Sequence, residues 1–259
     1  MRSKPYPRKT TSTSWEPVSK WYSQSVGKDG HYYHQFVILP KLLNLLNLND
    51  NSSLVDLACG QGILARHIPE KVPYLGIDIA PSLIGEAKRL DKNTKHNYLV
   101  GDLAKPLKLE GQTFTHATMI LALQNLAKPD GAFKQIASVL KPNGMFAMVI
   151  NHPYFRIPRQ SSWGVDESKK VQYRRIDLYL SEQKIPIQAH PSEGTQSSET
   201  WSFHYPLSTY IRWLNEAGFV IERLEEWCSD KKSEGKMAKM EDRSRAEFPL
   251  FMTLIARKK

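Results

Sequence analysis

A short apolar run that leads into a glycine-rich turn constrains this chain more than any other feature. The segment from Leu54 to Gly62 reads LVDLACGQG, and a second apolar run ends at Gly76-Ile77-Asp78. Glycine is needed where the backbone approaches a ligand closely or takes conformations that a β-carbon disfavours. A strand, a glycine turn and a helix start in succession therefore predict a nucleotide-cofactor site with the helix N-terminus over the ligand.

Acids at the predicted strand ends decide between cofactors. Gly60 to Ala65 also fits the G-x-G-x-x-A fingerprint of dinucleotide-binding proteins, with Asp78 at about the right distance to bind a ribose hydroxyl. Asp56, however, would face a pyrophosphate with like charge, which is unfavourable. S-adenosylmethionine has no phosphate and carries a sulfonium and an ammonium, so it suits an anionic site formed by Asp56, Asp78 and Asp102. A dehydrogenase is therefore the least favoured alternative.

These residues resemble the class I S-adenosylmethionine-dependent methyltransferases, in particular those that act on small molecules. The motifs are a D-x-x-C-G-x-G signature at Asp56 to Gly62, Gly101-Asp102-Leu103, the Leu140 to Gly144 turn, and a last helix and strand over Tyr210 to Val220. The resemblance implies an α/β fold, with a Rossmann-like, mainly parallel seven-stranded sheet, helices on both faces and a closing antiparallel hairpin. It also implies an enzyme whose cofactor is S-adenosylmethionine, whose product is S-adenosylhomocysteine and which uses no metal.

The alternation of apolar runs and helical periods predicts the elements of such a sheet. We expect strands at Ser53–Leu57, Tyr74–Ile77, Tyr98–Val100, Phe114–Ile120, Met145–Ile150, Phe219–Leu224 and Pro249–Ala256. We expect helices at Ile63–Ile68, Pro81–Leu90, Asp130–Leu140 and Leu207–Ala217. Asp130 is the expected N-cap, Pro81 a helix start and Gly218 a C-cap, and Pro40 should kink or restart an N-terminal helix.

The chain divides into five predicted parts. These are a disordered basic tail at 1–14, an N-terminal helical lid at 15–48, a cofactor-binding core at 49–150, an inserted β-rich roof at 151–206 and the rest of the core at 207–259. The insertion is rich in aromatic residues, and alternation predicts strands at Val171–Leu180 and Glu199–Tyr205. Since ligands of open α/β sheets bind outside the carboxyl ends of the strands, we expect the insertion to cover the acceptor site.

The resemblance assigns cofactor contacts to particular positions. Asp56 should interact with the methionine end directly or through water, and Gly60 and Gly62 should let the backbone approach. Asp78 should hold the ribose hydroxyls, and Asp102 with Leu103 should face the adenine. Further cofactor contacts are expected from Tyr22 and Tyr33 in the N-terminal region and from residues near strand ends, namely Ala58, Ile79, Ile120, Leu121 and Gln124.

The candidate residues of the acceptor site are chosen by where they lie in the sequence. Candidate bases are His34, His152 and His204, although methyl transfer needs a base only when the acceptor is a poor nucleophile. Tyr154, Trp163 and Trp201 are the expected walls of the acceptor site. Asn151-His152-Pro153-Tyr154 is similar to the Asn-Pro-Pro-Tyr box of amino-methyltransferases, but it follows the fifth predicted strand rather than the fourth. We therefore interpret it as part of the roof.

Composition bounds the remaining choices. No apolar run approaches the roughly 20 residues of a membrane helix, and the N-terminus lacks the apolar stretch of a secretory signal, which together predict a cytoplasmic protein without a membrane partner. The two cysteines, Cys59 and Cys228, have no zinc-binding spacing. Of the net charge of +10, residues 1–20 and 230–259 carry +4 each. This basic balance keeps RNA or another macromolecule open as the methyl acceptor, and a non-catalytic binding protein is a further alternative, but a small organic acceptor is favoured.

Overall fold

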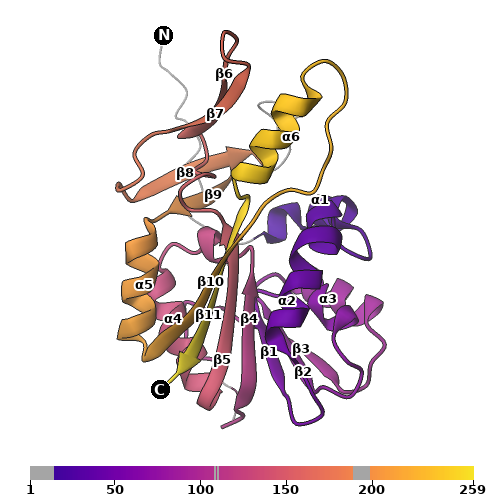
Figure 1. Cartoon of the computed structure of the whole chain (residues 1–259). Coiled ribbons are helices and arrows are strands. Elements are labelled where there is room, and N and C mark those ends of the chain that lie inside the picture. Colours follow the sequence, from indigo (N-terminus) through magenta and orange to yellow (C-terminus); the bar gives the residue numbers. More distant parts are fainter. Residues whose placement is uncertain (1–14, 108, 110, 189–198) are drawn as a thin grey trace, which may run out of the picture.

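A seven-stranded sheet forms the centre of the computed structural model, which describes residues 15–107, 109, 111–188 and 199–259 (Figure 1). The strand order is β10-β11-β5-β4-β1-β2-β3. Only β11 runs against its neighbours, pairing antiparallel with both β5 and β10. This confirms the predicted Rossmann-like fold, and the strands are β1 (Leu54–Leu57), β2 (Tyr74–Asp78), β3 (His96–Val100), β4 (Phe114–Ile120), β5 (Leu140–Asn151), β10 (Phe219–Trp227) and β11 (Phe251–Lys258).

Helices cover both faces of this sheet, as Figure 1 shows. One face carries α4 (Pro129–Val139) and α5 (Leu207–Glu216), and the other carries α2 (Leu39–Leu46) and α3 (Pro81–Leu90), with α1 (Ser19–Val26) beside α3. Because successive side chains of a strand point to opposite faces, β1 sends Val55 and Leu57 into the α4–α5 core and Leu54 into the α2–α3 core. The sheet is therefore apolar on both faces.

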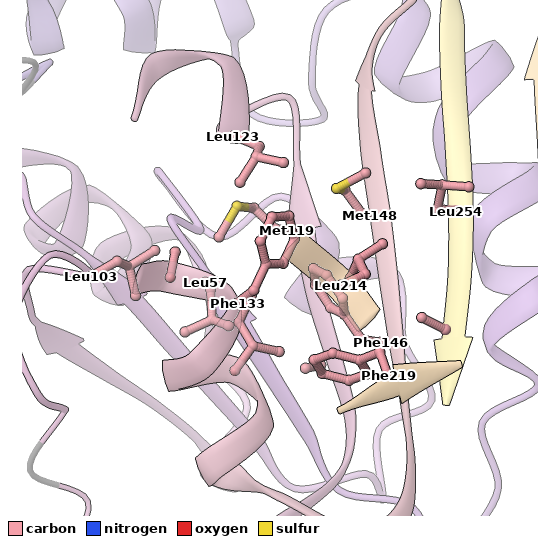
Figure 2. Packing of buried hydrophobic residues seen from close by; sticks show 14 of the residues in the cluster. Leu57, Leu103, Met119, Leu123, Phe133, Phe146, Met148, Leu214, Phe219 and Leu254 are labelled. Carbon is pink, nitrogen blue, oxygen red and sulfur yellow. The ribbon is translucent and has the colours of Figure 1, made fainter. Parts of the chain in front are cut away.

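The core on the α4–α5 side is closely packed (Figure 2). Phe133 of α4 meets Phe146 of β5 edge to face, with ring centroids 6.1 Å apart, and Phe146 in turn contacts Phe219 at 5.7 Å. Leu214 of α5 is fully buried in the same cluster. Burial of a side chain of this size contributes roughly 1.5–3 kcal/mol, so these contacts hold β5, and the loop that follows it, in place.

The N-terminal region is helical, as predicted. It consists of a 3-10 turn at Glu16–Val18, α1, and a π-helical turn at His34–Ile38 that leads directly into α2. Pro40 lies in the first turn of α2, where its missing N–H costs nothing, so the expectation that it restarts the helix is confirmed. Pro81 likewise begins α3.

Three local predictions were wrong. The helix expected at Ile63–Ile68 is a single 3-10 turn, Leu64–His67, because Ile68 is extended before Pro69, as residues that precede proline usually are. Asp130 does not cap α4, which begins at Pro129 after Lys128; it lies in the first turn, where its charge favours the helix dipole. The cap of α5 is Ala217 rather than Gly218.

The insertion forms two antiparallel hairpins beyond the end of β5, at the top of Figure 1. These are β6 (Ser161–Asp166) with β7 (Val171–Ile176) and β8 (Gln183–Gln188) with β9 (Glu199–His204). The strands predicted in this insertion correspond to β7 and β9, whereas β6, β8 and α6 (Ala238–Glu247) were not predicted. Residues 140–144, expected as a turn, are the start of β5, opposite an irregularity in its pairing with β4.

Two further expectations concern the N-terminal tail and membrane-spanning helices. The predicted tail at 1–14 lies outside the described residues. Within the part of the chain that the structure describes, the helices are too short or too polar to cross a membrane.

Gly218 gives a first testable prediction. It follows α5 with a φ of +87°, and a β-carbon there would meet no atom within 4 Å, so the only penalty of Gly218→Ala is backbone strain. We expect a loss of about 1 kcal/mol in unfolding free energy. Gly85→Ala, on the exposed side of α3 with equally open space, is the matched control and should stabilise by about 0.5–1 kcal/mol. Urea unfolding of both variants measures the difference, and equal signs would contradict it.

Candidate functional site

A cavity of about 630 Å³ lies at the carboxyl ends of β1, β2 and β4. The N-terminal region, the 3-10 turn Leu123–Asn125 and the inserted segment complete its wall. Eleven of the thirteen residues predicted to bind cofactor contribute to that wall: Tyr22, Tyr33, Ala58, Gly60, Asp78, Ile79, Asp102, Leu103, Ile120, Leu121 and Gln124. The topology thus brings together residues from five separate segments of the sequence.

Asp78, at the end of β2, is an acid of the cavity wall whose carboxylate is held by two backbone hydrogen bonds. Its Oδ2 accepts the N–H of Gly60 at 2.8 Å and its Oδ1 accepts the N–H of Ala80 at 2.9 Å. Burial raises the pKa of this carboxyl group, although the two backbone donors act in the opposite direction. Each carboxylate oxygen keeps a further lone pair, so Asp78 can accept hydrogen bonds from a ligand without losing its own partners.

The loop after β1 brings backbone to the cavity. Gly60 has a φ of +56°, and a β-carbon there would lie 3.6 Å from the ring and hydroxyl of Tyr22. Two non-glycine residues of the wall are also left-handed, Ala58 with φ 55° and Leu121 with φ 53°. Such conformations cost of order 1–3 kcal/mol and gather at functional sites, here where β1 and β4 end.

Asp102 and Leu103 follow β3 at the far side of the cavity. Asp102 Oδ1 accepts the N–H of Ala104 at 2.9 Å, and Leu103 is only 6% exposed, inside the α4–α5 core. An apolar wall with an acid beside it suits a planar, polar-edged ring.

Asp56 and Gly62, which were also expected to act at the cofactor, are not among the residues that line the cavity. Asp56 is 3% exposed, and its oxygens accept the hydroxyls of Tyr74 at 2.9 Å and Thr118 at 2.8 Å. Burial raises its pKa to about 7. Gly62 is needed for internal packing instead, because a β-carbon there would lie 2.7 Å from the hydroxyl of Tyr98.

The N-terminal region supplies aromatic and imidazole groups. The hydroxyl of Tyr33 lies 3.3 Å from Ser229 Oγ, and its ring packs on Phe251 at 5.7 Å. His34, the one candidate base that lines the cavity, is 6% exposed and stacks on His31 at 4.0 Å. Burial lowers the pKa of His34 to about 3, so its imidazole is neutral at pH 7.

The other two candidate bases are engaged elsewhere. His152 Nε2 pairs with Glu226 Oε1 at 2.7 Å, while its Nδ1 accepts the N–H of Tyr154 at 3.2 Å. His204 Nε2 lies 2.7 Å from the carbonyl oxygen of Tyr179. Neither residue is among those that line the cavity; His152 links the insertion to β10, and His204 makes a contact within the insertion.

The three expected acceptor walls also lie outside the cavity. Trp163 is 41% exposed, packs on Phe248 and carries the guanidinium of Arg174 5.0 Å above its ring. Tyr154 is equally exposed and packs on Tyr179. Trp201 lies under Lys184 Nζ at 4.1 Å. Each of these rings therefore packs against another side chain of the protein in this structure.

Instead, the wall opposite Asp78 includes residues that the sequence analysis missed. These are His31, Asn151, Arg156, Ser202 and Phe251. They come from the N-terminal region, the end of β5 and the loop after it, β9 and β11. A lone arginine or asparagine in a loop carries no periodic signal, so only the fold reveals that these residues share a site.

The residues present fit S-adenosylmethionine. Asp78 and Asp102 line the cavity next to backbone and apolar groups. The glycine loop leads into a 3-10 turn, not into an α-helix whose N-terminus could bind a phosphate. Polar atoms of three lining side chains, Trp15 Nε1, His34 Nδ1 and Gln124 Oε1, are buried and have no hydrogen-bond partner among the described residues, which is rare unless a ligand or water completes them. Among the described residues no three His, Cys, Asp or Glu side chains cluster as metal ligands would.

Comparison with known proteins agrees with this reading of the geometry. Residues 55–148 match the family described as "Methyltransferase domain". A solved S-adenosylmethionine-dependent methyltransferase from Mesorhizobium loti superposes with a TM-score of 0.68 at 25% identity, over 90% of this chain and all of that one. The chain thus carries a methyltransferase domain and has the fold of a class I S-adenosylmethionine-dependent methyltransferase. Its cofactor is accordingly S-adenosylmethionine.

Curated relatives match this methyltransferase over shorter stretches. A demethylmenaquinone methyltransferase of Chlamydia muridarum is 27% identical over 128 residues, 48% of this chain and 52% of the relative. Its counterpart in Staphylococcus saprophyticus is 25% identical over 109 residues, 40% of this chain and 47% of the relative. The matches span only about half the length of these relatives, so they leave the acceptor of this methyltransferase to be argued from the cavity.

Proposed function

We propose that this methyltransferase transfers the methyl group of S-adenosylmethionine to a small organic acceptor held in the same cavity. The observation that carries the proposal is a single cavity that extends from Asp78 and Asp102 to the inserted segment. In this proposal residues 15–48 act as a lid, residues 151–206 contribute one wall of the acceptor site, and 49–150 with 207–259 form the cofactor-binding core.

The proposed cofactor contacts follow from where each residue lies. Asp78 binds the ribose hydroxyls, and Asp102 with Leu103 borders the adenine. Gly60 brings backbone to the methionine end, while Asp56 acts from beneath through its charge rather than by contact. The sulfonium supplies an activated methyl group, so the chain has mainly to align an acceptor with it.

His34 is the side chain that we propose to orient the acceptor. Its Nδ1 is buried without a hydrogen-bond partner among the described residues, so a ligand in the cavity could supply that partner. A group whose pKa is about 3 holds a proton poorly, so His34 is a weak general base at neutral pH. It can still accept a hydrogen bond from an acceptor hydroxyl or amine. The acceptor itself must therefore be nucleophilic without strong base catalysis.

Two observations favour a small acceptor over RNA. The demethylmenaquinone methyltransferases are named for a small-molecule acceptor, although identity to them is low. The cavity is also partly lined by apolar side chains such as Leu126, Ile187 and Phe251 rather than by a row of cations. We place such an enzyme in the cytoplasm.

A labelled-methyl assay tests the proposal. The purified chain with tritiated S-adenosylmethionine should label members of a small-molecule panel of phenols, amines and carboxylic acids, and mass spectrometry should find the addition of one methyl group. Total RNA should take up no label above a heat-inactivated control, and any RNA binding should weaken steeply with salt. His34→Asn should lower kcat/KM without changing the shape of the pH–rate profile between pH 5 and 8. Selective labelling of RNA would contradict the small-molecule acceptor.

A further inference from the structure

Arg156 stands out in the acceptor wall because its charge is unmatched. It lies in the loop after β5, and its backbone N–H donates to the carbonyl of His152 at 2.8 Å. Its guanidinium makes no hydrogen bond or ion pair with any described residue, yet the residue lines the cavity and keeps an exposed surface there. Burial by the surrounding protein lowers the pKa of Arg156. Both facts describe a cation in a cavity wall without a partner.

The neighbouring charges do not neutralise it. Arg174 is close enough for mutual repulsion, and its own guanidinium is occupied by the carbonyl of Phe155 at 2.9 Å and by Ser161 Oγ at 2.8 Å. Glu226, on β10, is already paired with His152. Two guanidinium groups lie near each other, therefore, and only one has partners.

The acids of the cavity lie on its other side. In the sheet order, β4 and β1 separate β5, which leads to Arg156, from β2, which ends at Asp78. Three strand spacings amount to roughly 14 Å, too far for direct pairing. The guanidinium of Arg156 is therefore an exposed cation of the cavity wall that no acid neutralises, and an anion is the ligand that it can pair with.

We propose that Arg156 binds a carboxylate of the methyl acceptor, so that the substrates of this enzyme are small carboxylic acids. The inference rests on the proposed function, because it concerns the acceptor side of the same cavity. The planar guanidinium fork matches a carboxylate in two parallel hydrogen bonds, which fixes orientation as well as position. The rings of Tyr33 and Phe251 in the same wall suit an aromatic acid.

The cofactor also carries a carboxylate, on its methionine end, and this is the competing partner for Arg156. The ribose, adenine and glycine-loop contacts proposed above follow β1, β2 and β3, and the further contacts expected within the sheet reach as far as the end of β4, whereas Arg156 follows β5. We therefore assign Arg156 to the acceptor. One measurement distinguishes the carboxylate of the acceptor from that of the cofactor. Arg156→Gln would weaken the binding of S-adenosylhomocysteine only if Arg156 contacted the cofactor.

Calorimetry with a matched pair of probes tests the assignment. 4-Hydroxybenzoate and 4-hydroxybenzamide have the same shape and differ in charge, and each is titrated into the chain saturated with S-adenosylhomocysteine. The wild type should bind the benzoate at least 10-fold more tightly than the benzamide. Arg156→Gln should weaken benzoate binding about 10- to 100-fold, leave the benzamide within 2-fold, and leave S-adenosylhomocysteine affinity unchanged. The benzoate affinity of Arg156→Lys should fall between those of the wild type and Arg156→Gln.

Arg159→Gln is the matched control, since Arg159 is an exposed arginine of the same loop that does not line the cavity. It should bind both probes as the wild type does. Equal affinity of the wild type for the two probes, no binding of either at millimolar concentration, or a benzoate preference that survives Arg156→Gln would overturn the inference, as would a loss of S-adenosylhomocysteine affinity in Arg156→Gln. A wild type that fails to bind S-adenosylhomocysteine would instead refute the proposed function itself.

Discussion

Asp78→Asn should weaken S-adenosylhomocysteine binding by about 1–3 kcal/mol, roughly 5- to 150-fold. The substitution removes the charge and leaves an amide nitrogen where a carboxylate oxygen now accepts the N–H of Gly60 or Ala80. Two donors then face each other at the loop, and the ribose hydroxyls lose their acceptor. Calorimetry at fixed pH and salt measures the effect.

A matched control separates this local effect from a general change in charge. Asp50→Asn makes the same chemical change at an exposed residue before β1, which pairs with the exposed Lys71 at 3.4 Å. It should leave the affinity unaltered. Wild-type affinity in Asp78→Asn, or tight binding of NAD by the wild type, would refute the assignment of Asp78 to the ribose.

The sheet and the cofactor side of the cavity were predictable because they depend on local signals. An apolar run that is buried on both faces reads as a strand wherever it occurs, and β1 is buried at all four positions. The glycine loop and the acid that ends β2 each follow such a run directly. Since carboxyl ends of parallel strands meet at one edge, their positions in the sequence sufficed to bring these residues together.

The missed elements lack such a signal. Only Ser244 is buried in α6, whose face carries charged side chains such as Arg243 and Glu247, so no apolar period marks it as a helix. No residue of β6 is buried. These elements form by pairing and docking on the rest of the fold, which sequence patterns do not record.

The residues that line the acceptor side of the cavity could not be identified from the sequence for another reason. Aromatic residues in the insertion indicate burial or stacking but not the partner. Trp163 found Arg174 and Phe248, while Phe251, which the sequence analysis had placed only in a strand, reached the cavity. Which of several aromatic residues faces a ligand depends on hairpin packing over long sequence distances.

Asp56 gives the prediction with the largest expected effect on stability. Its pKa is about 7 in the folded chain against an ordinary value of 3.8, because burial disfavours the charged form. Between these two values the folded state holds a proton that the unfolded state has lost. The free energy of unfolding should therefore fall as the pH rises from about 4 to 7, by up to about 4 kcal/mol from this group.

Two variants test this origin of the pH dependence in the cofactor-free chain. Asp56→Asn is uncharged at every pH, so it should lose most of the decline and gain stability relative to the wild type as the pH rises. Thr118→Val removes the hydroxyl that donates to Asp56 Oδ1 at 2.8 Å and favours the charged form. In this variant the pKa of Asp56 should be higher still, so the free energy of unfolding should keep falling beyond the pH at which that of the wild type levels off. Urea unfolding across pH 4 to 8 measures all three, and parallel curves would show that Asp56 ionises alike in both states.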